Sequence, residues 1–165
     1  MKVIDYAAFA YCSSLISIRL PDSLKIIDGL AFHSCTSLES IIIPEQTEVV
    51  DYGAFYNCIA LTSIHLPDSV QVIGEKAFSE CKSLASVRLP NHIHAIEPYT
   101  FDGCTALTDT HIPDSVLLIR HYAFKHCTKL TSVYIHNTAC SINPIAFFDC
   151  PCRFFKIARS GTGEE

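Results

Sequence analysis

The chain has 165 residues, of which 49% are apolar and 18% charged, a composition that predicts a folded core and excludes a disordered chain. Its formal net charge of −5 argues against a nucleic-acid-binding protein, because such proteins usually carry a basic stripe. No apolar run of about 18 residues is present, so no membrane span is expected, and residues 1–6 lack the hydrophobic stretch of a signal peptide.

A Phe followed by a Cys three residues later recurs seven times, always 23 residues apart and without insertion. The seven pairs are Phe9/Cys12, Phe32/Cys35, Phe55/Cys58, Phe78/Cys81, Phe101/Cys104, Phe124/Cys127 and Phe147/Cys150. A fixed period of about 20–50 residues predicts a solenoid, in which each coil packs only on its neighbours. We therefore expect residues 1–150 to form one domain of roughly six to seven coils, with these Phe and Cys residues stacked as ladders in its core.

The first segment of each coil has strand spacing. In residues 15–20, Ile18 and Leu20 are predicted to point inward, while Ser17 and Arg19 point outward, and the other coils repeat this alternation. A proline at 21 ends the segment, since proline has no N–H to give to a sheet. Stacked coils are expected to join these segments into one parallel sheet.

Two further segments complete each coil. Residues 24–27 carry an apolar pair, Leu24 and Ile27, which predicts a brief extended segment on the opposite wall. The Ala-Phe-X-X-Cys-X-X-Leu segment that follows is too short for an independent helix, and its spacing predicts a tight turn or one 3₁₀ turn. The sequence thus predicts short β-strands and turns with little helix.

The two ends of the chain depart from the repeat. Residues 152–157 are apolar and are expected to cover the last coil as a cap strand, so that 151–165 form a cap-like segment with a mobile tail from 161. The chain starts at the repeat position of Leu24, halfway through a coil. A fragment of a longer array, or end-to-end self-association through uncapped terminal coils, would each explain this start.

The motif Leu-X-X-Ile-X-Leu-Pro followed by Ala-Phe-X-X-Cys at a strict 23-residue period resembles the leucine-rich repeats of the cysteine-bearing, BspA-like class. The resemblance covers roughly residues 4–150 and implies a leucine-rich repeat solenoid, a right-handed superhelix with its parallel sheet on the concave face. It also implies protein binding or adhesion, at the cell surface or in secreted proteins, without shared catalytic residues. Thr100, Thr110 and His136 depart from the repeat, where alanine, an aliphatic residue and proline are usual.

The nine cysteines admit three interpretations. A small, buried core residue is the one that we favour for the seven ladder positions. Side chains in a ladder point in parallel, which disfavours disulfides between coils. Zinc needs a closed set of ligands, and only Cys150 and Cys152, with Cys140 upstream, approach one. A nucleophilic thiol needs access and a base in a cleft, so we expect no catalytic residue, metal or cofactor.

The outward positions of the first segments form two columns. One is nearly constant: Ser17, Ser40, Ser63, Ser86, Asp109 and Ser132. The other varies from coil to coil and is the candidate protein-binding surface: Arg19, Ile42, His65, Arg88, His111 and Tyr134. Arg and Tyr are enriched in binding hot spots, although any exposed strand face must carry some polar residues. We expect this column to contact an acidic or polar protein surface, more tightly once His65 and His111 are protonated.

The sequence therefore predicts a non-catalytic module that binds an unidentified protein, or mediates adhesion, through the concave strand face. The alternative is a set of structural spacer repeats within a larger cell-surface protein. A column that varies between coils favours binding, whereas a constant column would favour the spacer.

Overall fold

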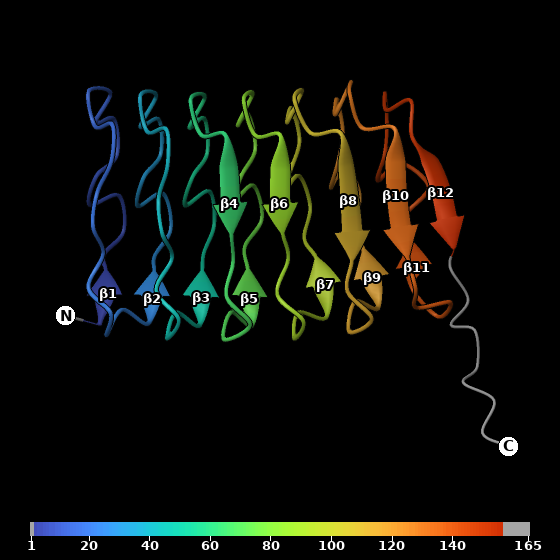
Figure 1. Ribbon diagram of the computed structural model, residues 1–165, viewed down its shortest axis with the longest axis horizontal. Helices are drawn as coiled ribbons and strands as arrows, with labels where there is room; N and C mark the ends of the chain where they lie inside the picture. The colour runs from blue at the N-terminus through green and yellow to red at the C-terminus, as the bar shows by residue number, and fades with distance from the viewer. Residues whose placement is uncertain (1, 157–165) are drawn as a thin grey trace, which may run out of the picture.

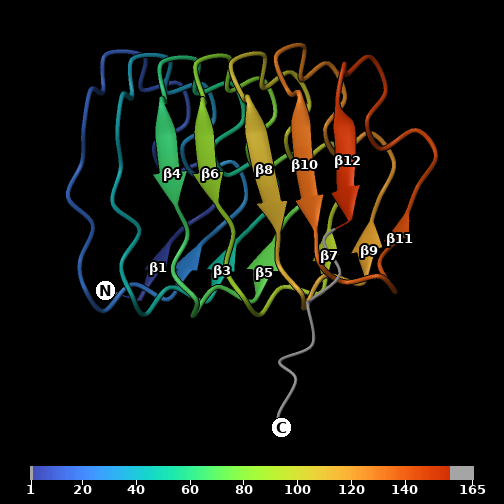
Figure 2. The ribbon, with the colours of Figure 1, turned by 45° about the vertical axis from the view of Figure 1, so that its right-hand side comes forward.

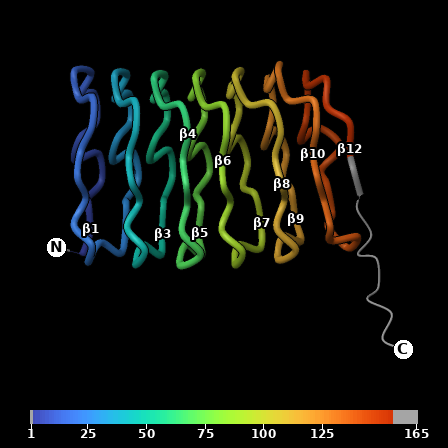
Figure 3. The backbone as a smooth tube through the Cα atoms, in the orientation of Figure 1, coloured from blue at the N-terminus to red at the C-terminus, as the bar shows by residue number. Residues whose placement is uncertain are grey.

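The computed structural model describes residues 2–156, and in this range the chain winds into a row of similar coils (Figure 1). The tube through the Cα atoms shows the same course repeated from the N-terminal to the C-terminal end (Figure 3). The described residues contain strands and turns and no helix, so none that could cross a membrane. The solenoid predicted from the 23-residue period is confirmed.

Seven two-residue strands, here called the back strands, follow the proline turns. They are β1 (Val3–Ile4), β2 (Ile26–Ile27), β3 (Val49–Val50), β5 (Val72–Ile73), β7 (Ala95–Ile96), β9 (Leu118–Ile119) and β11 (Ser141–Ile142). They pair in parallel in two sheets, β1-β2-β3-β5 and β7-β9-β11. Each residue lies opposite its equivalent one period later, as Ile4 does to Ile27, so the second segment of the repeat is extended as predicted.

The front strands come from the first segment of the repeat, and their outward side is called the strand face below. They are β4 (Ser63–His65), β6 (Ser86–Arg88), β8 (Asp109–Ile112), β10 (Ser132–Ile135) and β12 (Arg153–Lys156). All the pairs are parallel. Figure 2 shows the front strands side by side, with the loops of the coils returning behind them.

The expectation of one continuous front sheet is wrong. The front strands form two sheets, β4-β6 and β8-β10-β12, and the first two coils contribute no strand to either. Among the described residues, one backbone hydrogen bond joins the front segments of those two coils, from the Glu39 amide to the Ile16 carbonyl (3.0 Å). A single bond does not make a ladder, which is the immediate reason for the missing strands.

Strand β12 extends the front sheet beyond the last full repeat. It pairs in parallel with β10, with Arg153 opposite Ser132, an offset of 21 residues instead of 23. The ring of Phe154 meets the ring of Phe147 edge to face at 4.9 Å. The cap-like segment therefore lies against the last coil as a further parallel strand, while the boundary at residue 150 stays a prediction and the expected tail, 161–165, lies outside the described residues.

The seven ladder phenylalanines stack behind one another along the core. Neighbouring ring centroids are 4.9–5.6 Å apart and the ring planes differ by 2–18°. The five central rings are fully buried. Phe9 and Phe147, at the ends of the column, are only half-buried.

The ladder cysteines form a second column in which each thiol reaches back one coil. Cys58 donates to the Phe32 carbonyl (3.2 Å) and Cys81 to the Phe55 carbonyl (3.1 Å), and Cys35, Cys104, Cys127 and Cys150 repeat this bond with a ladder phenylalanine 26 residues earlier. The expectation that all seven are core residues is wrong at the ends. Cys12 is exposed, since no described coil precedes it, and Cys150 is half-buried.

The loops behind the strands form their own inter-coil ladder. The amides of Ala7, Phe9 and Tyr11 donate to carbonyls of the next coil (2.7–2.9 Å), while Ala8 and Ala10 bond three residues back. Two positions in the loop, those of Ala7 and Tyr11, have positive φ (54° and 62°), and the pattern recurs in later coils. This left-handed conformation breaks the predicted 3₁₀ geometry, so the segment is the tight turn that was its alternative.

Candidate functional site

The structure places the six candidate residues in one file along the strand face. Arg19, Ile42, His65, Arg88 and His111 are exposed, and Tyr134 is half-buried. Ile42 is the extreme case, with 84% of its surface exposed although it is a large aliphatic residue. The strand alternation explains this, because the neighbouring Ile41 and Ile43 point into the core and leave Ile42 on the outer side.

His65, Arg88 and Asp68 interact on β4, β6 and the turn after β4. Arg88 Nη1 lies 2.6 Å from His65 Nε2, and Arg88 Nη2 lies 3.8 Å from Asp68 Oδ2. The guanidinium can only donate, so the contacting nitrogen of His65 must be the unprotonated acceptor. The Asn91 amide donates to Asp68 Oδ1 (3.0 Å), and this bond, with the nearby Arg88, lowers the pKa of Asp68.

His111 and Tyr134 form the C-terminal part of the column. Their rings stack with centroids 4.4 Å apart and planes 15° apart, across the β8–β10 pair. A stacked pair presents a broad, flat aromatic surface with polar tips, a common feature of protein-binding surfaces. The candidate residues therefore meet in neighbouring groups along the face and not at one point.

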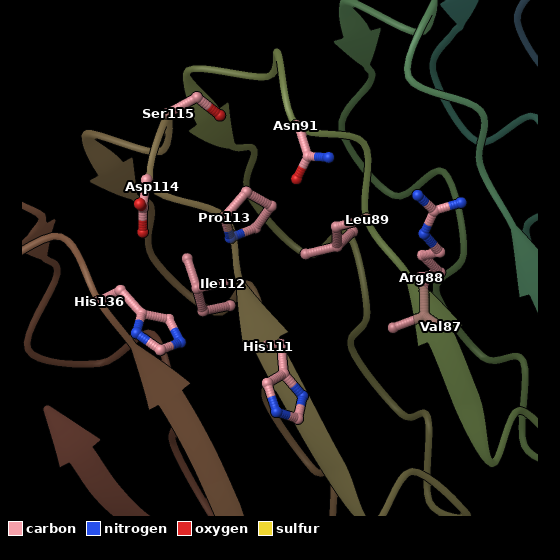
Figure 4. Close-up of a pocket in the computed structure, with 10 residues that line it drawn as sticks. All are labelled: Val87, Arg88, Leu89, Asn91, His111, Ile112, Pro113, Asp114, Ser115 and His136. Carbon is pink, nitrogen blue, oxygen red and sulfur yellow. The ribbon is translucent and has the colours of Figure 1, made fainter. Parts of the chain in front are cut away.

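The largest hollow on the strand face lies beside Arg88 and His111. This Arg88 hollow has a volume of about 640 Å³. Arg88 enters it from β6, His111 from β8 and His136 from just after β10, and the Pro113 turn closes one side (Figure 4). It is lined by Val87, Arg88, Leu89, Asn91, His111, Ile112, Pro113, Asp114, Ser115 and His136.

A second hollow lies near the N-terminal end of the same face, beside Arg19 and Ile42. This Ile42 hollow has a volume of about 530 Å³ and includes Ser17, Ser40 and Pro44. Four of the six candidate residues thus line a hollow. The two hollows differ in chemistry, because the first offers a guanidinium and two imidazoles and the second offers a bare isoleucine.

Sequence reasoning missed three residues that shape the Arg88 hollow. His136 stands where other coils have proline, and this exception was visible in the sequence without a role attached to it. Asn91 and Asp68 occupy the turn position after the proline, which was interpreted only as turn-forming. Their side chains are hydrogen-bonded across coils, Asn91 Nδ2 to Asp68 Oδ2 at 3.3 Å, and this pairing depends on a spatial neighbour 23 residues away.

The chemistry of the strand face is that of recognition. Within residues 2–156 no group of three or more His, Cys, Asp or Glu is arranged to hold a metal ion. Ser115 in the Arg88 hollow donates its hydroxyl to the Ile93 carbonyl (2.7 Å). What the face offers a ligand is therefore hydrogen-bond donors, imidazoles and exposed apolar surface.

The family model for the BspA type leucine rich repeat region, in six copies, matches residues 2–93 and 48–162. The chain belongs to the BspA-type leucine-rich repeat family. Solved structures agree: a leucine-rich repeat protein of T. pallidum (TpLRR) is 29% identical with a TM-score of 0.74, over 88% of this chain and 73% of that one. No curated protein matches the chain.

Two further solved structures share the BspA-type fold at lower identity. A leucine rich cell surface protein of Faecalibacterium prausnitzii is 24% identical with a TM-score of 0.63, over 97% of this chain and 59% of that one. A leucine-rich repeat protein of Eubacterium ventriosum is 22% identical with a TM-score of 0.69, over 91% of this chain and 45% of that one. This BspA-type chain therefore spans about half the length of those two proteins.

Proposed function

We propose that this chain is a non-catalytic, protein-binding or adhesive part of a cell-surface protein, and that it binds through the strand face. The observation that supports this best is the pair of hollows on a column whose residues change from coil to coil. Repeat solenoids commonly bind on the surface that their front strands create. The cell-surface location rests on the F. prausnitzii relative, which carries that description.

The Arg88 hollow supports an acidic or polar partner. Arg88 and two imidazoles converge there, and arginine pairs well with carboxylates because its fork of N–H groups matches their geometry. Asp68 already holds one side of the Arg88 guanidinium at 3.8 Å. A partner carboxylate therefore competes with Asp68 for Arg88, and protonation of His65 would release the guanidinium from its neighbour.

We test this function by capture from solution. Immobilised protein is incubated with extracellular protein extracts, and Arg88→Glu is compared with Arg120→Glu, which also changes an arginine paired with a carboxylate (Glu97, 3.0 Å) but away from the strand face. The same partner is expected on the native protein and on Arg120→Glu, with at least tenfold less on Arg88→Glu. A second variant, Arg19→Glu, examines the Ile42 hollow.

The expected pH dependence has a defined sign. The imidazoles of His65, His111 and His136 become positive as pH falls, and the charges that face them on the neighbouring coils are Arg88, Asp68 and Asp114. Binding of an acidic partner is therefore expected to be tighter at about pH 5.5 than at about pH 7.5. The same capture by every variant at both pH values would favour the spacer function instead.

A further inference from the structure

A separate pocket opens among the loops, away from the front strands and their hollows. This tyrosine pocket is lined by Leu30, His33, Tyr52, Gly53, Tyr56 and Lys76, from three consecutive coils, and has a volume of about 290 Å³. That volume suits a single ring-sized group better than an extended peptide. None of these residues was singled out in the sequence.

Glycine at position 53 keeps the floor of the pocket open. Its φ is +55°, and a Cβ placed there would lie 2.7 Å from Leu30 Cδ2. The equivalent positions in neighbouring coils hold Leu30 and Lys76 with the same left-handed φ (56° and 59°). The backbone therefore accepts a side chain at this repeat position, and its absence at Gly53 creates the space.

Aromatic rings form the walls. Tyr52 is exposed over 42% of its surface, and Tyr56 stacks on His33 with centroids 5.1 Å apart. The ammonium of Lys76 lies 5.8 Å from the centre of the Tyr52 ring and 5.4 Å from that of Tyr99, so it is held at the rim by cation–π contacts. The pocket thus combines aromatic surfaces with phenol hydroxyls and an ammonium donor.

His33 has one ring nitrogen without a partner. Asn57 Nδ2 donates to Ser34 Oγ (3.0 Å), and Ser34 Oγ lies 3.4 Å from His33 Nε2. Because the hydroxyl accepts from Asn57, its own proton is available for Nε2, which leaves the proton of a neutral ring on Nδ1. His33 Nδ1 is buried and has no hydrogen-bond partner, and burial lowers the pKa of His33, which favours the neutral ring. A buried unpaired donor is an unmet demand for an acceptor.

The pocket has no unbalanced charge. Lys76 is the one charged residue that lines it, and Glu75 Oε1 lies 3.5 Å from the Lys76 ammonium. A charged ligand would have to displace this ion pair, whereas a neutral one would not. The chemistry therefore calls for a neutral ring with an apolar face and hydrogen-bonding edges.

We propose that the tyrosine pocket binds a neutral pyranose unit of a glycan. The C–H face of such a sugar packs on Tyr52 and Tyr56, while its hydroxyls bond to the polar groups at the rim and at His33. This is a second ligand class on a second surface, independent of protein binding by the strand face. An anionic sugar and an aromatic peptide side chain are the rival occupants.

The experiment uses the full chain labelled with 3-fluorotyrosine, whose seven tyrosines give fluorine resonances that single Tyr→Phe variants assign. The probes are the methyl glycosides of glucose, galactose, mannose and N-acetylglucosamine, added separately. At least one is expected to shift the Tyr52 and Tyr56 signals in a saturable manner, with a dissociation constant of about 1–10 mM, as for small ligands in open pockets. The Tyr6 and Tyr134 signals should stay unchanged.

Variants separate the pocket from the rest of the loop surface. Tyr52→Ala is expected to weaken binding roughly tenfold, followed on the Tyr56 signal, while Tyr52→Phe keeps the ring and stays within about threefold. Gly53→Ala fills part of the floor and is expected to weaken binding. The matched control is Tyr6→Ala, because Tyr6 occupies the repeat position of Tyr52 two coils earlier, is 63% exposed and lies outside the pocket.

Four results would overturn the assignment. They are no saturable shift with any of the four glycosides, equal weakening by Tyr6→Ala and Tyr52→Ala, binding of methyl glucuronide without binding of the neutral sugars, and binding of N-acetyltyrosine amide in place of the sugars. Far-ultraviolet circular dichroism establishes that each variant keeps the fold. Tyr52→Phe and Gly53→Ala provide the test if Tyr52→Ala does not fold.

Discussion

At the scale of single residues, the Cys81 thiol shows what the repeated cysteine contributes. It is fully buried and donates to the Phe55 carbonyl of the preceding coil (3.1 Å), which also accepts the Cys58 amide (3.2 Å). A larger polar side chain would not fit beside the stacked rings, and alanine would offer no donor. Cysteine thus supplies a small side chain with a hydrogen at the point where two coils meet.

The first prediction concerns this bond. Cys81→Ala removes the thiol donor and leaves a small void, so the free energy of unfolding should fall by about 1–2 kcal/mol. The measurement is the urea midpoint under reducing conditions. Cys12→Ala, at the exposed end of the same column, is the control and should change stability by less than about 0.5 kcal/mol. Equal effects of the two substitutions would contradict a role for the buried bond.

The second prediction follows from thiol ionisation. Burial raises the pKa of Cys35 to about 11 and that of Cys81 to about 12, from an ordinary value of 9.0. The folded protein keeps these protons at pH values where the unfolded chain loses them. Their contribution to stability is therefore complete below about pH 9 and is lost as the pH rises towards 12. Urea midpoints at about pH 8 and about pH 10.5 should differ more for the native protein than for Cys81→Ala.

At the scale of the strand, β8 contains a polar exception. Thr110 is 2% exposed at a position where Ile64 and Val133 occupy other coils, and its hydroxyl has no hydrogen-bond partner. A buried unpaired hydroxyl destabilises, because it has lost its hydration without a replacement. The front strand thus pays a stability penalty in the coil that carries His111.

The third prediction is that Thr110→Val stabilises the protein. Valine has the shape of threonine without the hydroxyl, so the free energy of unfolding should rise by about 1 kcal/mol. Thr108→Val, on the exposed side of the same segment, is the matched control and should have a smaller effect. An unchanged or lower urea midpoint for Thr110→Val would mean that the hydroxyl is satisfied in solution.

The strand alternation and the coil length could be predicted because both are written locally in each repeat. Ile41 and Ile43 are buried and Ile42 is exposed, as a two-residue period requires. The break between β6 and β8 could not be predicted, because the front segments of all the coils share one pattern. Nor could the tyrosine pocket, which arises where Gly53 interrupts a row of side chains contributed by separate coils.

At the scale of the whole molecule, stability is distributed along the stack. Phe78 has a ring partner on each side at 5.4 Å and 5.6 Å, while Phe9 has one described ring partner, Phe32, at 5.2 Å. In a solenoid each coil is held by its neighbours only, so a terminal coil has less to hold it. Local opening is therefore expected to be easiest at the ends.

The fourth prediction compares the two rings. Phe78→Ala should cost about 3–5 kcal/mol, the usual range for a buried phenylalanine, and should unfold the stack as a unit or split it. Phe9→Ala should cost roughly half as much, because its ring is already half-buried. Hydrogen exchange should show faster amides confined to the first coil in Phe9→Ala. Similar losses in both variants would contradict a stack held by nearest neighbours.

The constant offset of 23 residues between paired strands has an evolutionary consequence. Removing or duplicating one whole period rejoins equivalent backbone points, so the interior sees the same rungs before and after. The exterior does not: the guanidinium of Arg88, which now meets His65, would face the residue of a different period. Gene recombination can therefore shuffle surface neighbours in such an array while the packing beneath them is preserved.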